Sequence, residues 1–311
     1  MTRTYIGVDL SKDVLDIRDP RRGPARIANA PAALAPWLAG LEPDAVVVYE
    51  ATSRCDRPLR LALDEAGHPG VRLNPLHAWH FARSLNLPKT DRVDAAMLAR
   101  FGAERQPAPD PALDTAREEL RALHQRRDQL KRMEVQEKNR LSACTLPVVG
   151  RDIRAELRGL ARRVRRIEAA IADHLARHPE LAAAERLLRS IPAIGAVTAL
   201  TLVAHLGELG QVDRRAIASL AGLAPRARES GRYQGRRVLG EGRRHVRRAL
   251  YMAALTALRH PGFLADFVAR MKAAGKPGKV ILMAVARRLL TVANAVLRDR
   301  VPFQPTGARA A

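Results

Sequence analysis

Four carboxylates in the N-terminal third of the chain have the types and spacing to hold divalent metal ions. Asp91 and Asp94, in KTDRVDAAMLAR, are three residues apart, which places both on one face of a helix, about 5–6 Å apart at Cβ. Such like charges repel unless a cation lies between them. Asp9 and Glu50 lie in IGVDL and VVVYE, segments with the pattern of strands. Oxygen ligands from three elements suit a pair of Mg²⁺ ions about 3.5–4 Å apart, an arrangement that serves phosphodiester chemistry.

Asp91 and the nearby Lys89 each have a simpler interpretation as well. Asp91 follows Thr90 at the start of the predicted helix, so its side chain could cap that helix instead of binding metal. Lys89, just before the acidic pair, could contact the scissile phosphate or could be an ordinary surface lysine.

The elements that must position the carboxylates have an α/β pattern. In chain order we predict two strands over 4–19 with a turn at 11–13, a weaker strand in 21–30, a helix over 31–41, a buried strand over 45–49, a helix over 57–66 and a strand over 71–74. Acids at strand ends of an open α/β sheet lie where ligands bind. We therefore expect a mixed α/β domain over residues 1–105.

A linker and a helical pair are predicted next, over residues 106–180. The sequence QPAPDP at 106–111 has the composition of a linker. Residues 113–141 and 151–178 have helical spacing of apolar residues, with a turn expected around Pro147 to Gly150. The two helices would form an antiparallel pair, which could be a coiled coil. This helical pair would either pack against the rest of its own chain or form an arm that contacts another copy of the protein.

Residues 181–300 predict a mainly helical domain, interrupted by a basic segment and followed by a tail over 301–311. From Arg226 to Arg248 there are nine basic residues against two acidic ones, interleaved with glycines. The run is either a solvated charged surface or a loop that approaches a phosphate backbone. The candidate phosphate contacts are Arg226, Arg228, Arg232, Arg236, Arg237, Arg243, Arg244 and Arg247. His245 is predicted to be a phosphate contact or a surface residue.

The segment SIPAIGAVTALTLVAHLG predicts a helix, a Pro-x-x-Gly turn and a second helix. Turn amides ending at Gly195 could hold a phosphate without reading sequence, as in a helix-hairpin-helix. A purely structural turn is the alternative.

The charge of the chain is concentrated in its C-terminal two thirds. The formal net charge is +22 over 311 residues. Residues 1–110 hold 15 basic and 14 acidic residues, a net of +1, which leaves +21 for the rest. A basic surface of this size binds nucleic acid, an anionic membrane or an acidic protein. Aromatic residues make up only 4% of the chain, so duplex or structured nucleic acid fits best, with a basic protein of ribosomal type as the structural alternative.

Neither a leader nor a disulfide framework is indicated. The segment MTRTYIGVDLSKDVLD lacks the continuous apolar core of a signal peptide, and no run reaches about 18 apolar residues. Cys55 and Cys144 are isolated from each other in sequence. We expect a soluble cytoplasmic protein, associated with the bacterial nucleoid.

Several motifs together resemble the DEDD transposases of the IS110 class, relatives of the pilin-gene invertases that include the bridge-RNA-guided recombinases. The matching segments, in the order of the family, are GVDLSK (7–12), YEAT (49–52), KTDRVDA (89–95), SIPAIG (190–195), GLAPRARESG (222–231) and EGRRHVRRALYMAAL (241–255). KTDRVDA is the most specific of them.

The resemblance implies a RuvC-like, ribonuclease-H-like N-terminal domain whose acidic tetrad is Asp9, Glu50, Asp91 and Asp94, with Mg²⁺ as cofactor. It also implies a helical coiled-coil segment and a mainly α transposase domain with Ser230 as nucleophile. Members of the family resemble metal-assisted serine recombinases in which one protomer's acidic site works with a partner's serine. Bridge RNA, element-end and target DNA, and a homodimer or homotetramer are the partners it implies.

The function expected from the sequence is therefore DNA strand cleavage and exchange by a transposase. Two alternatives remain: a RuvC-like nuclease that only hydrolyses DNA, with Ser230 structural, and an inactive nucleic-acid-binding protein.

Overall fold

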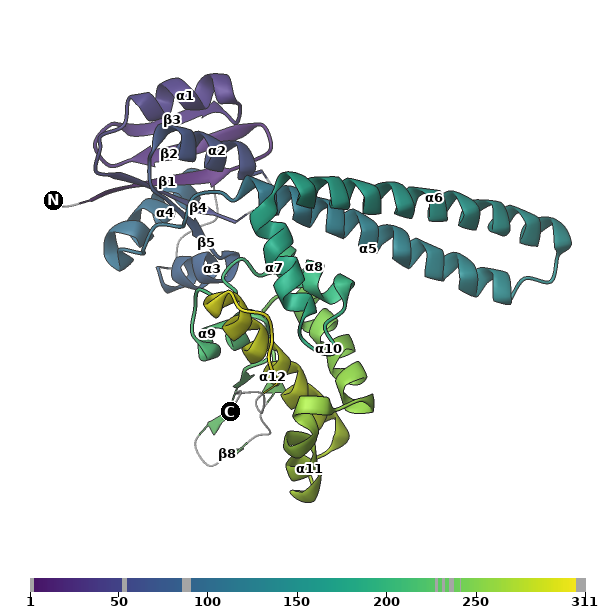
Figure 1. Cartoon of the computed structure of the whole chain (residues 1–311). Coiled ribbons are helices and arrows are strands. Elements are labelled where there is room, and N and C mark those ends of the chain that lie inside the picture. The colour runs from purple at the N-terminus through teal and green to yellow at the C-terminus, as the bar shows by residue number, and fades with distance from the viewer. Residues whose placement is uncertain are drawn as a thin grey trace. The chain divides into compact units, whose positions relative to one another are not determined.

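The chain divides at Asp114 into two units, Met1–Asp114 and Thr115–Ala311, each with its own hydrophobic core. The structure is a computed structural model (Figure 1). It describes residues 3–51, 55–85, 91–226, 229–230, 233–234, 238–240 and 242–305.

A five-stranded mixed sheet forms the centre of the N-terminal unit. Its strands are β1 (Thr4–Leu10), β2 (Val14–Asp19), β3 (Gly23–Ala28), β4 (Ala45–Glu50) and β5 (Gly70–Leu73). They lie in the order β3-β2-β1-β4-β5, with β1, β2 and β3 antiparallel and β1, β4 and β5 parallel. The expected mixed α/β domain is confirmed.

Helices cover both faces of this sheet. Leu34 and Leu38 of α1 (Pro31–Ala39) and Leu59 and Leu63 of α2 (Arg57–Ala66) share one core with alternate residues of β1, β2 and β4. The helices α3 (Pro75–Ser84) and α4 (Asp91–Arg105) pack on the other face, beside Val46 and Val48. Strand β4 is buried on both faces from Ala45 to Tyr49, where its side chains are apolar without interruption.

Helix α4 contacts strand β1 backbone to backbone. A Cβ atom at Gly7 would lie 1.9 Å from the carbonyl oxygen of Ala95 and 2.4 Å from the amide nitrogen of Ala99. Farther along the helix, a Cβ at Gly102 would lie 2.7 Å from the side chain of Tyr5. Glycine at these positions therefore permits the approach, and α4 runs antiparallel to β1.

The segment predicted as a linker belongs to the N-terminal unit. The amide of Asp110 donates to the carbonyl of Gly70 at 2.7 Å, and the amide of Leu113 donates to the carboxylate of Asp64 at 2.6 Å. These bonds hold the proline-rich chain against β5 and α2. The unit consequently ends at Asp114, nine residues beyond the expected 105.

The C-terminal unit begins with a long helical hairpin, α5 (Thr115–Ser142) and α6 (Pro147–Arg177) (Figure 1). Leu130, Leu160 and Val164 form a small core between the two helices. The connection spans 143–146 and differs from the predicted turn at 147–150. Pro147 occupies the first turn of α6, where its fixed φ and missing N–H suit a helix start.

The remaining helices pack around one apolar core. They are α7 (Pro179–Arg189), α8 (Ala196–His205), α9 (Arg214–Leu220), α10 (Arg244–Arg259), the 3-10 turn η1 (Gly262–Leu264), α11 (Ala265–Ala273) and α12 (Gly278–Asp299). Among the described helices, α12 is long and apolar enough to cross a membrane. Its apolar face, including Val285 and Leu289, is buried in this core, as expected of a central helix in a folded domain.

Replacing Gly7 by valine is expected to unfold the N-terminal unit selectively. The added Cβ would collide with the backbone of α4, which cannot move aside as a flexible side chain can, so we expect a loss of about 3 kcal/mol in the free energy of unfolding. The fluorescence of Trp37 and Trp79, the two tryptophans of the chain, reports on this unit during urea unfolding. The control is Gly278→Ala, where an added Cβ meets no atom within 4 Å. An unchanged midpoint for Gly7→Val would contradict the packing.

Candidate active site and nucleic-acid interface

The positions of Asp9 and Glu50 lie side by side at the carboxyl ends of two parallel strands. The register pairs Val8 of β1 with Tyr49 of β4, so the next residue of each strand is one of the two acids. Alternation places them on the sheet face that carries Val48 and is covered by α4. Both side chains are half-buried and both have partners.

Helix α4 brings the other two acids to the same level. Two residues of a strand span about 6.6 Å, which corresponds to about four residues of a helix. Since α4 runs opposite to β1 and its middle lies over Gly7, its first turn, with Asp91 and Asp94, lies at the level of Asp9. Asp94 is half-buried and precedes the buried Leu98 by one helical turn.

The resulting set of positions, which we call the carboxylate cluster, comprises Asp9, Glu50, Asp91 and Asp94. An all-carboxylate donor set is the type that Mg²⁺ prefers. The structure describes the backbone of Asp91 and not its side chain. Among the described side chains, which include those of Asp9, Glu50 and Asp94, no group of three or more His, Cys, Asp or Glu residues lies close enough together to hold a metal ion. Lys89 lies outside the described residues.

Ser230 lies in a small β-ribbon rather than in an irregular loop. Strand β7 (Glu229–Ser230) pairs with β8 (Tyr233–Gln234), and β6 (Pro225–Arg226) pairs with β9 (Val238–Leu239), all antiparallel. The pairing of Ser230 with Tyr233 places the serine at the end of the inner strand pair. The side chains of Arg226 and Ser230 are not described. Arg228, Arg232, Arg236 and Arg237 lie outside the described residues.

The ribbon returns to the helical core through Gly242 and Arg243. Gly242 has a φ of +77°, and a Cβ there would lie 2.4 Å from the amide nitrogen of Gly222. The Arg243 guanidinium donates to the carbonyl of His205 at 2.9 Å and forms a two-pronged ion pair with Glu208. Partial burial opposes ionisation of Glu208, but the hydrogen bonds from Arg243 lower its pKa.

Arg243 therefore has a structural role through its ion pair with Glu208, and its phosphate contact stays a prediction. Arg244, one residue later, is exposed at the start of α10 and remains a candidate contact. Arg247 is half-buried and has a partner.

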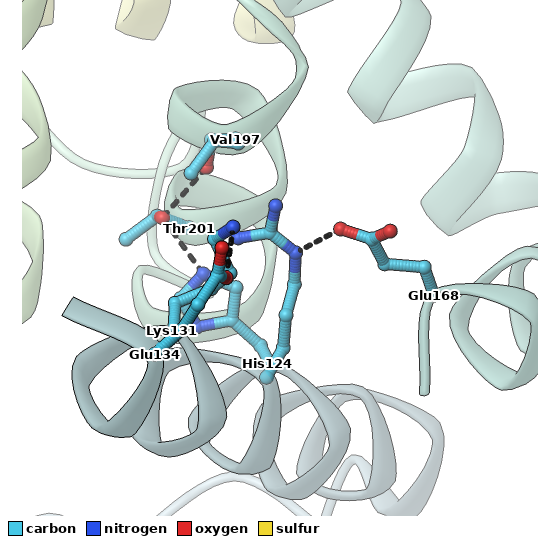
Figure 2. A network of polar contacts seen from close by, with 7 residues as sticks. His124, Lys131, Glu134, Glu168, Val197 and Thr201 are labelled. Atoms are coloured by element: carbon cyan, nitrogen blue, oxygen red, sulfur yellow. Dashed lines mark hydrogen bonds and ion pairs between the residues drawn. The ribbon is translucent and has the colours of Figure 1, made fainter. Parts of the chain in front are cut away.

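Three histidines from three helices meet beneath the first turn of α10. Nδ1 of the buried His124 lies 3.1 Å from Nε2 of the buried His205. The hydroxyl of Thr201 donates to the carbonyl of Val197 at 2.7 Å, so its oxygen accepts from Nε2 of His124 at 3.0 Å (Figure 2). His124 consequently accepts at Nδ1 from His205. The ring of His245 stacks on that of His205, with centroids 5.0 Å apart.

Burial keeps these rings neutral. It lowers the pKa of His205 to about 3 and lowers those of His124 and His245 below the ordinary value. His245 thus anchors α10 through a stacked ring that is half-buried, and its contact with phosphate stays a prediction. No sequence pattern could identify the cluster, because His124 and His205 are 81 residues apart.

The turn at 190–195 joins α7 to α8, as the sequence predicts. Ala193 has a φ of +72°, and Gly195 is the N-cap of α8, with no atom within 4 Å of an added Cβ. Ala196 and Val197, in the first turn of α8, are exposed, so its N-terminal end is accessible to an anion.

The histidine cluster makes the C-terminal unit sensitive to acid. The pKa of His205 is about 3 when folded and about 6.5 when unfolded, so the unfolded chain binds more protons between these values. The contribution of His205 to the free energy of unfolding is therefore fully present above pH about 6.5 and is lost as the pH falls below that value. As the pH falls, the free energy of unfolding is expected to drop by up to about 1.4 kcal/mol per pH unit from His205.

Denaturant unfolding at several pH values, followed by far-UV circular dichroism, measures this dependence. The variant His205→Gln can still donate to His124 and cannot titrate, so its stability should vary less steeply with pH. An equal slope in the variant would refute the assignment.

Two family profiles match the chain. The profile described as "Transposase IS116/IS110/IS902 family" matches residues 185–269, and a DEDD profile of the IS110 group, described as "Transposase", matches residues 21–147. The chain is also similar to the pilin gene-inverting proteins of Moraxella lacunata and Moraxella bovis. Identity is 30% over 318 aligned residues, covering 97% of this chain and 98% of each relative.

A shorter region is similar to an uncharacterized 42 kDa protein of insertion element IS900 from Mycobacterium paratuberculosis. Identity there is 38% over 98 residues, which cover 30% of this chain and 24% of that protein. The Moraxella relatives align over nearly their whole length, and the two profiles match one region in each half of the chain. The chain therefore belongs to the IS110 family of DEDD transposases.

Proposed function

We propose that this transposase is a metal-dependent DNA recombinase that joins the chemistry of the carboxylate cluster to a nucleophilic Ser230. The observation that carries the proposal is the convergence of β1, β4 and the first turn of α4, which places the positions of Asp9, Glu50 and Asp94 at one level on one face of the sheet.

The sheet topology supports a RuvC-like, ribonuclease-H-like assignment for the N-terminal unit. Three antiparallel strands lead into two parallel ones, in the order β3-β2-β1-β4-β5. In this arrangement β1 and β4 are central neighbours, and their carboxyl ends supply two of the four acids. Ligands of open α/β sheets bind at such ends.

Divalent metal dependence follows from membership of the DEDD family, and the four carboxylates would hold Mg²⁺, as two ions. When bound, the ions supply positive charge for the oxygens of the reacting phosphate. Asp9 and Glu50 are held by the sheet and Asp94 by a helix packed directly on it. The chain's own contribution is thus a rigid arrangement of donors.

Ser230 would attack the scissile phosphorus through its hydroxyl oxygen. The attack forms an O–P bond to the serine and breaks one P–O bond of the DNA backbone. The serine proton ends on the released oxygen, which becomes a hydroxyl. Reversal of this step with a second DNA end exchanges strands without loss of phosphodiester bonds, as expected of a recombinase rather than a hydrolase.

Basic residues of the C-terminal unit would hold the DNA by its phosphates. Arg244 and the α8 N-terminus after Gly195 are accessible, and Arg226, Arg243 and Arg247 remain predicted contacts. Lys89, in the N-terminal unit, is a further predicted contact. The same proposal assigns phosphate contacts to Arg228, Arg232, Arg236 and Arg237.

We further propose a bridge RNA as guide and a homo-oligomer in which the cluster of one copy serves the serine of another. Residues 111–311 carry a net charge of +21, more than the basic segment at 226–248 alone contributes. This excess supports binding of a large nucleic acid over more of the surface than that segment. Sequencing of RNA that co-purifies with the protein tests the guide.

Replacing Ser230 by alanine is expected to abolish a covalent protein–DNA adduct. Wild-type protein incubated with DNA carrying its element's ends should yield an adduct that survives denaturation, detected as a shifted band on a denaturing gel. Ser219→Ala, a change of the same type at an exposed position of α9, should leave the adduct unchanged. Completed strand exchange by Ser230→Ala would refute the nucleophile, and hydrolysis without any adduct would favour a RuvC-like nuclease.

Replacing Asp94 by asparagine is expected to abolish Mg²⁺-dependent strand cleavage while DNA binding persists. The carboxamide keeps the shape of the side chain and removes the charge that holds the cation. Asp173→Asn, on an exposed face of α6, is the charge-matched control. Mixing Ser230→Ala with Asp94→Asn should restore activity if the two sites act between copies. Full activity of Asp94→Asn alone would refute the metal assignment.

A further inference from the structure

A row of exposed arginines runs along the face of α6 that points away from α5. The opposite face, with Ile153, Leu160 and Val164, is buried. We call the exposed set the α6 arginine row: Arg151, Arg154, Arg158, Arg162, Arg165 and Arg166. At 1.5 Å per residue it spans about 22 Å of helix.

The row is not neutralised by the protein. Within the part of the chain that the structure describes, no carboxylate forms an ion pair with any of the six. The sequence explains this, since Asp152 and Glu156 have no arginine three or four residues away on the helix. Glu168, which lies three residues after Arg165, accepts from Arg127 of α5 at 2.8 Å.

The neighbouring helix shows the opposite arrangement. Glu134 of α5 accepts from both Lys131 and Lys138 at 2.6 Å, and Arg140 pairs with Glu137. Figure 2 shows Lys131 beside Glu134, with Glu168 engaged across the hairpin. These three cations of α5 are therefore paired within their own helix, whereas on α6 Arg163 has an ion pair, with Glu156, and the six arginines of the row have none among the described residues.

The row is also costly for the helix that carries it. Arg154, Arg158, Arg162 and Arg166 are spaced by four residues, so each repels the next. Gly159 adds an interior glycine, which disfavours a helix. Gly159, Arg162, Arg163 and Arg166 line a surface hollow of ≈ 510 Å³. Both the repulsion between these arginines and the interior glycine weaken α6 without stabilising the fold. Such locally unfavourable residues indicate a binding function, and for a row of arginines the expected ligand is a polyanion.

We infer that the α6 arginine row binds the phosphate backbone of double-stranded DNA, as a second contact surface separate from the basic segment at 226–248. The inference rests on the DNA chemistry of the proposed function. A span of about 22 Å corresponds to about six base pairs of duplex at 3.4 Å per base pair, a length over which phosphates of both strands are exposed. The binding reads no sequence, because arginines on a single exposed helix face grip phosphates in the same way whatever the bases.

The test compares two doubly neutralised full-length variants with wild type. Arg158→Gln/Arg162→Gln removes two cations of the row, and Lys138→Gln/Arg140→Gln removes two paired cations of α5. Affinity for a blunt DNA duplex without element sequence is measured by fluorescence anisotropy from about 50 to 200 mM salt. For the row variant, the slope of log K against log salt should become shallower by about 2, with affinity at low salt on the order of tenfold weaker. The α5 variant should keep the wild-type slope.

Far-UV circular dichroism supplies the second readout. The row variant should keep its helix content, since like-charge repulsion is relieved. An unchanged slope would overturn the inference, as would a change in oligomeric state by light scattering without a change in slope. A loss of affinity for duplex RNA alone would overturn the assignment to DNA. Asp94→Asn should bind with the wild-type slope, so failure of the catalytic proposal is distinguishable from failure of this one.

Discussion

The direct packing of α4 on β1 fixes the geometry on which the candidate active site depends. With glycine at position 7, the helix backbone lies against the strand with no side chain between them. The helix start that carries Asp91 and Asp94 is then set at the level of Asp9, and the parallel register sets Glu50 beside it. The four negative charges repel one another and would push β1, β4 and α4 apart. The direct backbone contact between α4 and β1 is rigid, so it is suited to hold these elements in place.

Strong local patterns made much of the fold predictable. The unbroken run from Ala45 to Tyr49 identified the central strand, and apolar spacing identified both hairpin helices. The expected turn was wrong because Pro147 begins a helix instead of ending one. The ribbon around Ser230 was missed because two-residue strands leave no alternation to detect. The chain at 106–111 looked like a linker from its prolines, but Asp110 is hydrogen-bonded to Gly70 and Arg72 of β5, which makes the segment part of the N-terminal unit.

Side-chain partnerships were the least predictable part of the site. Arg243 looked like its basic neighbours, and only the fold brings Glu208 to it. The histidine cluster likewise depends on three helices meeting. Positive charge in this protein therefore has two uses, which the sequence does not separate. Some arginines hold the fold together, as Arg243 does, and others remain exposed without a carboxylate, as the α6 arginine row does.

Helix α12 is long and apolar enough to cross a membrane. Its position near the end of the chain favours packing into the folded domain over insertion into a membrane during synthesis. The helices it packs against, α7, α9, α10 and α11, all precede it in sequence. Chains fold from the N-terminus as they emerge from the ribosome. An apolar docking surface can thus be assembled before α12 emerges, and Asn294, which bonds to Gly210 and Val212, fits that surface and would be costly in lipid.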